Sequence, residues 1–355
     1  MVNLRRRLAV CLGLSTVLIA ARCSVGGDAS KESSRIKFST AVGAGFRLDQ
    51  KVAVQDLAEW TKLPHPFGSA RQGEIAAWLR RRIDTLGLKV VDEPFVATVP
   101  NPALSGGSGP VATTLQRSGT NLYATPPNLA AAPCAIVLAT HIDTKDVLGL
   151  NYLGANDSGS SSVLLLQLLA YLHRPHNAKQ RSCAVIGAFF DGEEAVLANW
   201  NDGELLAPAK VIDHTYGSRY AAQRLQPCDT KTSTASTLMC LTKELGGVKL
   251  RALILLDMVG SPGLRLSRDQ NSSPELVDLL QQQAVAIGQP DRLSASAVAI
   301  EDDHLPFRQR GVPAVDLIDF EHLSIWHQAG DDASSIDMGS LQVAGQLAAG
   351  LVTAL

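Results

Sequence analysis

Short runs of mostly apolar residues alternate with longer segments of helical periodicity along most of the chain. The runs, which predict strands, cover residues 88–91, 135–139, 184–190, 252–256 and 314–318. A strand that is apolar at every position is typical of a sheet buried on both faces, and helices between such strands are the usual connections of a parallel sheet. We therefore predict an α/β fold, a single globular domain in which helices flank a central, mostly parallel but mixed β-sheet.

Three segments predict helices that pack against this sheet. In residues 71–87, apolar side chains recur at helical spacing opposite three consecutive arginines, and Gly87 ends the segment. Residues 160–172 and 274–287 are two further helical segments. Residues 101–121, in contrast, have no periodicity and are rich in glycine and serine, which predicts an exposed loop.

The first residues have the pattern of a secretory signal. Three arginines, Arg5–Arg7, precede an apolar run that is shorter than the roughly 20 residues of a membrane span. We expect residues 1–22 to be a signal peptide that is either cleaved or kept as a membrane anchor, residues 23–48 to be a flexible lead, and residues 49–355 to form the folded domain. The protein would enter the secretory pathway and be secreted or anchored on the lumenal side of the Golgi or another membrane.

The composition narrows the range of partners. The chain has 355 residues, 46% of them hydrophobic, with 32 basic and 34 acidic side chains. Such a chain can bury a large core, and its balanced charge gives no sign of a nucleic-acid groove. We therefore expect a small-molecule or peptide substrate and no nucleic acid.

Six cysteines bear on the redox state of the protein. In an oxidising compartment we expect a disulfide between Cys228 and Cys240, which share one polar stretch. Cys134 and Cys183 each stand at the start of an apolar run and could lie side by side. For this second pair we favour the interpretation as buried free thiols.

Acidic and histidine side chains follow three of the apolar runs where each predicted strand ends. His141 and Asp143 follow the second run, Glu193 and Glu194 the third, and Asp257 the fourth. Open α/β sheets place their ligand crevice outside the carboxyl ends of the strands, so these side chains are candidates for one site. The His141 and Asp143 pair is either a pair of metal ligands or a structural brace.

Asp157 and His327 supply what a zinc ion would still need. With Glu194 they form an Asp/Glu/His set that leaves one position open for water or substrate, as in catalytic zinc sites. Glu193, beside a ligand but aimed elsewhere, would stay free to move protons. Each residue also has an ordinary interpretation: Asp157 as a helix N-cap, the glutamates as part of a solvated loop, and His327 as a surface histidine.

Several longer blocks of sequence are more specific. They are Phe189–Ala195, Tyr216–Arg219, Asp302–Phe307, Arg310–Pro313 and Trp326–His327. In this order they closely resemble the glutaminyl-peptide cyclotransferases (glutaminyl cyclases) of the animal type, a branch of the zinc aminopeptidase superfamily. The resemblance extends from about Val52 to the C-terminus and implies a zinc aminopeptidase-like fold.

The resemblance also implies roles for individual residues. The zinc ligands of the family match Asp157, Glu194 and His327, which implies one Zn2+ per chain. The acid/base residue matches Glu193, and two carboxylates of a hydrogen-bonded network match Asp257 and Asp302. The substrate-binding walls of the pocket match Trp200, Trp326, Ile300 and Glu301, and Lys145 also fits the family pattern.

The implied reaction converts the N-terminal glutamine of a peptide or protein to pyroglutamate. The N-terminal amine attacks the γ-amide carbonyl of its own side chain, and ammonia leaves. Zinc would polarise the carbonyl, and Glu193 would carry a proton from the amine to the leaving nitrogen. We expect a monomeric, zinc-dependent acyltransferase whose partners are peptides and proteins with N-terminal glutamine.

The chain departs from the family pattern in a few places. A gapless comparison puts Asp316 where the family usually has a histidine, and Glu301 where it has a glutamine. Asp316 would add negative charge near the two network carboxylates, so that one member of the group stays protonated. Thr140 and Ser162 replace a cysteine pair that many relatives carry near the metal.

Two other functions stay open. In a two-zinc aminopeptidase of the same fold, His141 and Asp257 would bind a second metal ion and Asp157 would bridge the two. The blocks around the two tryptophans favour the cyclase. A catalytically inactive, receptor-like ectodomain would keep the fold for partner binding only, but the intact Asp/Glu/Glu/His set argues against it.

Overall fold

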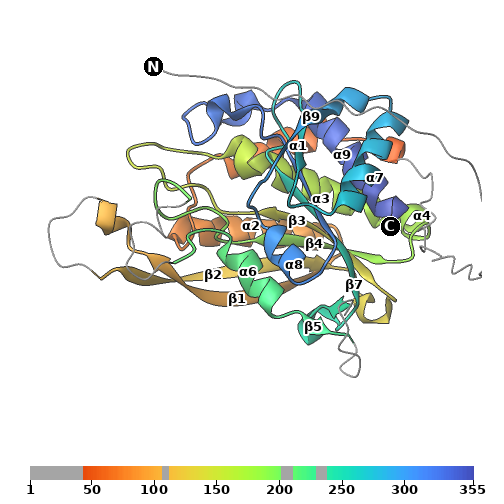
Figure 1. The fold of residues 1–355 in the computed structure, drawn as a ribbon, viewed down its shortest axis with the longest axis horizontal. Helices are drawn as coiled ribbons and strands as arrows, with labels where there is room; N and C mark the ends of the chain where they lie inside the picture. Colours follow the sequence, from red (N-terminus) through yellow and green to blue (C-terminus); the bar gives the residue numbers. More distant parts are fainter. Residues whose placement is uncertain (1–42, 106–111, 201–210, 229–237) are drawn as a thin grey trace, which may run out of the picture. The chain divides into compact units, whose positions relative to one another are not determined.

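The computed structural model describes residues 43–105, 112–200, 211–228 and 238–355 (Figure 1). All of them belong to the second of two compact units, Phe38–Leu355, into which the chain divides. The predicted signal segment and most of the predicted lead lie outside the described residues. Among the residues that are described, no helix is both long and apolar enough to span a membrane.

A six-stranded mixed sheet forms the centre of this unit. From one edge to the other its strands are β1 (Lys89–Pro100), β2 (Thr114–Thr125), β4 (Ala184–Phe190), β3 (Ala135–His141), β7 (Leu250–Asp257) and β10 (Ala314–Ile318). β3 runs parallel to both of its neighbours and β10 runs parallel to β7, whereas β2 is antiparallel to both β1 and β4. The predicted mixed α/β fold is confirmed.

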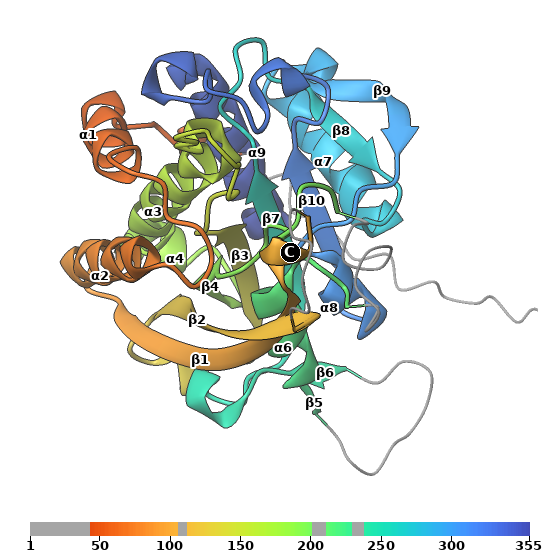
Figure 2. The ribbon, with the colours of Figure 1, turned by 90° about the vertical axis from the view of Figure 1, so that its left-hand side faces the viewer.

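Helices cover both faces of the sheet, which explains why its central strands are apolar at most positions (Figure 2). One face packs against α2 (Ala70–Thr85), α3 (Ser161–Leu172), α7 (Pro274–Ala286) and α9 (Met338–Ala354). The other packs against α6 (Tyr216–Gln223) and α8 (Leu305–Gln309). Alternate residues of a strand enter the two layers. In β3, Ile136 and Leu138 join the first, and Val137 and Ala139 join the second.

The remaining elements are short or peripheral. They are α1 (Gln50–Trp60), which packs on α3, α4 (Pro175–Ala178), the pair β5 (Gln226–Pro227) and β6 (Met239–Cys240), and the pair β8 (Leu266–Asp269) and β9 (Leu293–Val298). A π-helical turn, η4 (Ala155–Ser160), comes directly before α3. Short 3-10 helices cover Gly43–Gly45, Pro102–Ser105, Leu129–Ala131, Lys243–Leu245, Pro290–Arg292, Leu323–Ile325 and Ala333–Ser335.

The ends of the predicted helices agree with the structure where local signals mark them. The side chain of Ser69 accepts the N–H of Gln72 and caps α2. Gly87 follows this helix with φ of +71°, a conformation that glycine adopts without strain. The N-cap of α3 is Ser160, so the interpretation of Asp157 as an N-cap is wrong.

The predicted exposed loop over residues 101–121 is wrong in its second part, because β2 begins at Thr114. β1 also continues far beyond the predicted run 88–91. β2 pairs with β1 along its whole length, but with β4 only over Leu122–Ala124. The first half of β2 therefore lies outside the buried centre of the sheet, and it carries no apolar run that would reveal a strand.

Two disulfides link described residues. The Cys228–Cys240 bridge confirms the prediction. Cys134 and Cys183 also form a disulfide, so the interpretation as free thiols is wrong. These two cysteines directly precede β3 and β4, where Ala135 and Ala184 are partners in the parallel register. This register brings the two sulfur atoms together.

Removal of the Cys134–Cys183 bridge is expected to cost more stability than removal of Cys228–Cys240. The cysteines are 49 residues apart in the first bridge and 12 in the second. The entropy that a crosslink removes from the unfolded chain grows with the loop it closes, so paired alanine substitutions should lower the free energy of unfolding by about 4 and about 3 kcal/mol, respectively. Unfolding in guanidinium chloride measures both values. A larger loss for the shorter loop would contradict this order.

Candidate active site and metal centre

The parallel strands β3, β4 and β7 end side by side, and their carboxyl ends lie beside a cavity of about 310 Å³. Its lining consists of Asp157, Glu193, Glu194, Trp200, Asp257, Met258, Ala299, Ile300, Glu301, Asp302, Ile318, Phe320 and Trp326. The structure therefore brings together at one cavity the predicted ligands Asp157 and Glu194, the predicted catalytic carboxylates and the predicted substrate-binding residues. His327 is not part of this lining but contacts three of its residues, Asp157, Glu194 and Trp326. The candidates His141 and Asp143 are not among the lining residues. Met258 and Phe320 were not predicted. Their positions just after β7 and β10 are the signal that could have revealed them.

Asp157, Glu194 and His327 form a cluster with the spacing of metal ligands. One ligand atom of each lies within 4.8 Å of the others. His327 Nε2 is 3.2 Å from Glu194 Oε1 and 3.5 Å from Asp157 Oδ2. Both carboxylates are buried, and Glu194 Oε2 has no hydrogen-bond partner within the described part of the chain. Burying two carboxylates, one of them with an oxygen that has no partner, is costly unless a cation neutralises them. Aspartate, glutamate and histidine are all ligands that Zn2+ accepts.

The turn that presents Glu193 and Glu194 is held through its backbone. Gly192, shortly after the last residue of β4, has φ of +72° and lets the chain turn sharply. Asp143 accepts the backbone N–H of Glu193 at 2.9 Å and that of Glu194 at 3.1 Å. The buried Lys145 donates to two carbonyl groups just beyond the turn. None of these bonds uses a glutamate carboxylate, so both carboxylates are left for the site.

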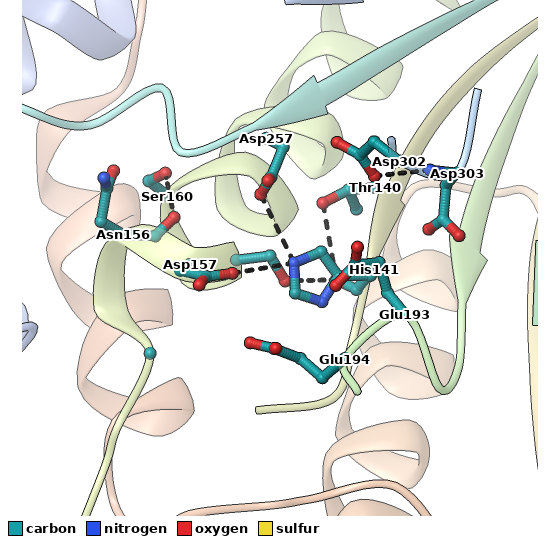
Figure 3. Close-up of polar contacts among 12 residues, drawn as sticks. Thr140, His141, Asn156, Asp157, Ser160, Glu193, Glu194, Asp257, Asp302 and Asp303 are labelled. Carbon is teal, nitrogen blue, oxygen red and sulfur yellow. Dashed lines mark hydrogen bonds and ion pairs between the residues drawn. The ribbon is translucent and has the colours of Figure 1, made fainter. Parts of the chain in front are cut away.

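His141, at the end of β3, lies between Asp157 and Asp257 (Figure 3). Its Nε2 is 3.0 Å from Asp157 Oδ1 and 3.4 Å from Asp257 Oδ1, and its Nδ1 is 3.1 Å from the carbonyl oxygen of Asp143. Burial opposes protonation, but hydrogen bonds with the three aspartates raise the pKa of His141 well above its usual value. His141, Asp157 and Asp257 also form a second cluster within 4.8 Å. The geometry therefore fits His141 both as a structural brace for Asp157 and Asp257 and as a metal ligand.

Three carboxyl groups of the cavity have raised pKa values, and burial is the largest cause for each. It raises the pKa of Asp257 to about 6 and, with the charge of Asp257, the pKa of Asp302 to about 7. For Glu193, burial and the charges of Asp302 and Glu194 outweigh the opposing charge of His141, so the pKa is well above its usual range. Groups of this kind can hold and release a proton near neutral pH, as acid–base chemistry requires.

Asp316, in β10, adds a buried carboxyl group to this network. Burial, followed by the charges of Asp302 and Asp257, raises the pKa of Asp316 well above its usual range. The buried His304 has its Nδ1 3.9 Å from Asp316 Oδ2 and its Nε2 2.9 Å from Asp269 Oδ2. These raised pKa values agree with the expectation that one carboxyl group of the set stays protonated.

Three aromatic side chains, Trp200, Phe320 and Trp326, form part of the cavity wall. Trp326 stacks on His327, with ring centroids 4.2 Å apart. Trp200 packs against His214, with centroids 4.4 Å apart. The side chain of Glu301 is 64% exposed and lies 3.4 Å from His214 Nε2, which places it at the rim. A flat, uncharged group can bind against these apolar surfaces while the acidic groups face its polar atoms.

Comparison with known proteins identifies relatives of the chain. The model of Peptidase family M28 matches residues 121–352. The glutaminyl-peptide cyclotransferase of Drosophila melanogaster is 28% identical over an alignment of 223 residues that covers 57% of this chain and 56% of that protein. That of Dictyostelium discoideum is 27% identical over an alignment of 220 residues that covers 59% of this chain and 57% of that protein. The chain thus spans little more than half the length of these curated relatives.

Solved structures share the fold over nearly the whole chain. A glutaminyl cyclase of an Acidobacteriales bacterium has a TM-score of 0.65 at 27% identity, covering 86% of this chain and 94% of that one. A leucine aminopeptidase precursor of Bacteroides thetaiotaomicron has a TM-score of 0.65 at 18% identity, covering 89% and 99%, and this likeness concerns the fold alone. Because the family model matches residues 121–352 of 355, the chain belongs to peptidase family M28.

Proposed function

We propose that this protein is a glutaminyl-peptide cyclotransferase, which converts the N-terminal glutamine of peptides and proteins to pyroglutamate and releases ammonia. One observation carries the proposal: the cavity contains carboxylates of a three-residue metal-ligand cluster beside a buried carboxylate, Glu193, that belongs to no such cluster in the described residues. The names of the curated relatives and of the Acidobacteriales structure support it.

Asp157, Glu194 and His327 would hold one Zn2+ per chain. They offer three donors of accepted type and leave a fourth position free, as catalytic zinc sites do. Bound there, a zinc ion would polarise the γ-amide carbonyl of the substrate as a Lewis acid.

Glu193 would move the proton that the reaction requires. A bond forms between the N-terminal nitrogen and the side-chain carbonyl carbon, and the bond from this carbon to the amide nitrogen breaks. A carboxylate that is not bound to the metal can accept the amine proton and deliver it to the leaving nitrogen, which departs as ammonia. Asp257 and Asp302 line the same cavity and would accept hydrogen bonds from the substrate amine.

The walls of the cavity would decide between cyclisation and hydrolysis. Trp200, Trp326 and Ile300 line it with apolar surface, and Glu301 at the rim would contact the rest of the peptide. Apolar walls around a bound glutamine side chain leave little room for a competing water molecule. The attacking group is then the amine of the substrate itself.

The two disulfides suit an oxidising compartment, which supports a place in the secretory pathway. The enzyme would be a monomer, secreted or anchored on the lumenal side of a membrane. Residues 1–22 would be the signal or anchor, residues 23–48 the lead, and residues 49–355 the catalytic domain.

The second ligand cluster favours one rival, a two-zinc aminopeptidase. In that enzyme His141 and Asp257 would bind a second ion, and Asp157 would bridge the pair. Its products would be free amino acids, with no ammonia released.

A peptide that begins with glutamine is expected to lose ammonia when incubated with the purified, zinc-loaded protein, and its N-terminus should become blocked to amine reagents. Metal analysis of the same preparation should give one zinc ion per chain. Two ions per chain together with free amino acids would identify the aminopeptidase instead. No reaction with any peptide would favour the inactive ectodomain.

A further inference from the structure

Asp331 joins the two loops that carry Asp157 and His327. It follows His327 in the same loop and is 1% exposed. Its Oδ1 accepts the backbone N–H of Asn156 at 2.6 Å, and its Oδ2 accepts that of Asp157 at 3.3 Å. Its own carbonyl accepts the N–H of Ala155 at 3.3 Å. One buried aspartate thus ties the backbone that presents the first candidate ligand to the loop that presents the second.

Tyr152 contacts all three of these side chains. Its buried hydroxyl is 2.8 Å from Asp331 Oδ2 and 3.2 Å from Asp157 Oδ2, so two carboxylates share its single proton. Asp157 Oδ2 is the oxygen that faces His327 Nε2. The ring of Tyr152 also packs edge-on against that of His327, with centroids 5.6 Å apart.

Neither ligand owes its position to a regular helix or strand. His327 has φ of +53°, which residues other than glycine seldom adopt. Asp157 and Ser158 lack helical backbone angles inside η4. Backbone of this kind keeps its conformation only where surrounding contacts enforce it. The bonds of Asp331 and Tyr152 are such contacts on both loops.

We propose that Asp331 and Tyr152, together called the clamp, are positioning residues that set the metal affinity of the site. They would hold Asp157 and His327 at binding distance before an ion arrives. The inference rests on the proposed function, because it assumes zinc at Asp157, Glu194 and His327. Groups that orient metal ligands in this way typically account for roughly 10- to 100-fold in affinity.

Tyr152→Phe tests the clamp, because it removes the hydroxyl and keeps the ring that packs against His327. In the full chain, zinc affinity measured by competition with a chromogenic chelator is expected to fall roughly 10- to 100-fold. The visible absorption of the cobalt-loaded protein should also change, since the ligand geometry around the ion relaxes. Asp331→Asn should act in the same direction.

Tyr123→Phe is the matched control. Tyr123 is 3% exposed and donates to the carboxylate of Glu93 at 2.8 Å, and neither residue belongs to a ligand cluster found in the described ranges. This variant should lose thermal stability to a similar extent and keep the zinc affinity and the cobalt spectrum of the wild type. Equal losses of affinity in both tyrosine variants, or none in Tyr152→Phe, would overturn the clamp alone. A wild-type chain that binds no zinc would overturn the proposed function as well.

Discussion

Glu193→Gln is expected to lower the rate of pyroglutamate formation about 10²- to 10⁴-fold, the range that general acid–base catalysis contributes. Glutamine keeps the shape of the side chain but cannot accept the amine proton. Glu193 is 4% exposed and lines the cavity, and it lies outside both ligand clusters of the described residues. The zinc content of the variant should therefore equal that of the wild type.

Steady-state kinetics on a glutaminyl peptide, with metal analysis of the same preparations, measure both quantities. Glu301→Gln is a suitable control, because it makes the same chemical change at the exposed rim of the same cavity. It should alter KM and leave kcat nearly unchanged. A Glu193→Gln enzyme with most of its kcat would show that another group moves the proton.

Most of the candidate site could be predicted because the strands that carry it are buried on both faces. His141, Glu193 and Asp257 lie at or shortly after the ends of the apolar runs of β3, β4 and β7. Because neighbouring parallel strands end side by side, these residues come together in the fold. What the sequence could not separate was the two roles of His141. Its distances to Asp157 and Asp257 fit a brace as well as a ligand.

The sequence did not predict the Cys134–Cys183 disulfide, which depends on strand register, or the first part of β2, which lies outside the buried centre of the sheet. The Cys134–Cys183 bridge requires that Ala135 and Ala184 face each other, and neither apolar run carries information about its offset from the other. Residues 114–121 of β2 fall within the predicted loop, because this part of the strand pairs with β1 alone and is mostly not buried. A strand segment that is not covered on both faces has no reason to be apolar at every position.

The sequence predicts Asp143 only as the partner of His141, and it gives no sign of the role of Asp331. Asp143 and Asp331 act by accepting backbone N–H groups from other segments. Any buried aspartate near an irregular turn can make such bonds, so the residue type alone is no signal. The role of Asp143 and Asp331 becomes visible only when the fold brings each carboxylate next to the backbone of a distant segment.

Glu194→Gln is expected to abolish tight zinc binding and, with it, cyclase activity. The amide oxygen is an uncharged and weaker donor, so only Asp157 and His327 would remain as full ligands. Zinc that binds only the folded state stabilises it by about 4 kcal/mol when its concentration is a thousand times the dissociation constant. This stabilisation should be present in the wild type and absent from the variant.

Without zinc, this difference in stability should nearly vanish. Beside the larger effect of burial, the charge of Glu194 raises the pKa of both Glu193 and Asp257, so the buried carboxylates repel one another when no cation is bound. Burial opposes protonation of His327, but the charge of Glu194, 3.2 Å away, raises the pKa of His327 to about 10, and this attraction is lost in the variant. In a chelator, Glu194→Gln should therefore unfold at a Tm close to that of the wild type. Thermal unfolding with zinc and with chelator measures both effects, and Glu193→Gln, the same change one residue earlier, should keep the zinc-dependent rise in Tm. If Glu194→Gln kept that rise too, the ion would have to bind at His141, Asp157 and Asp257 instead.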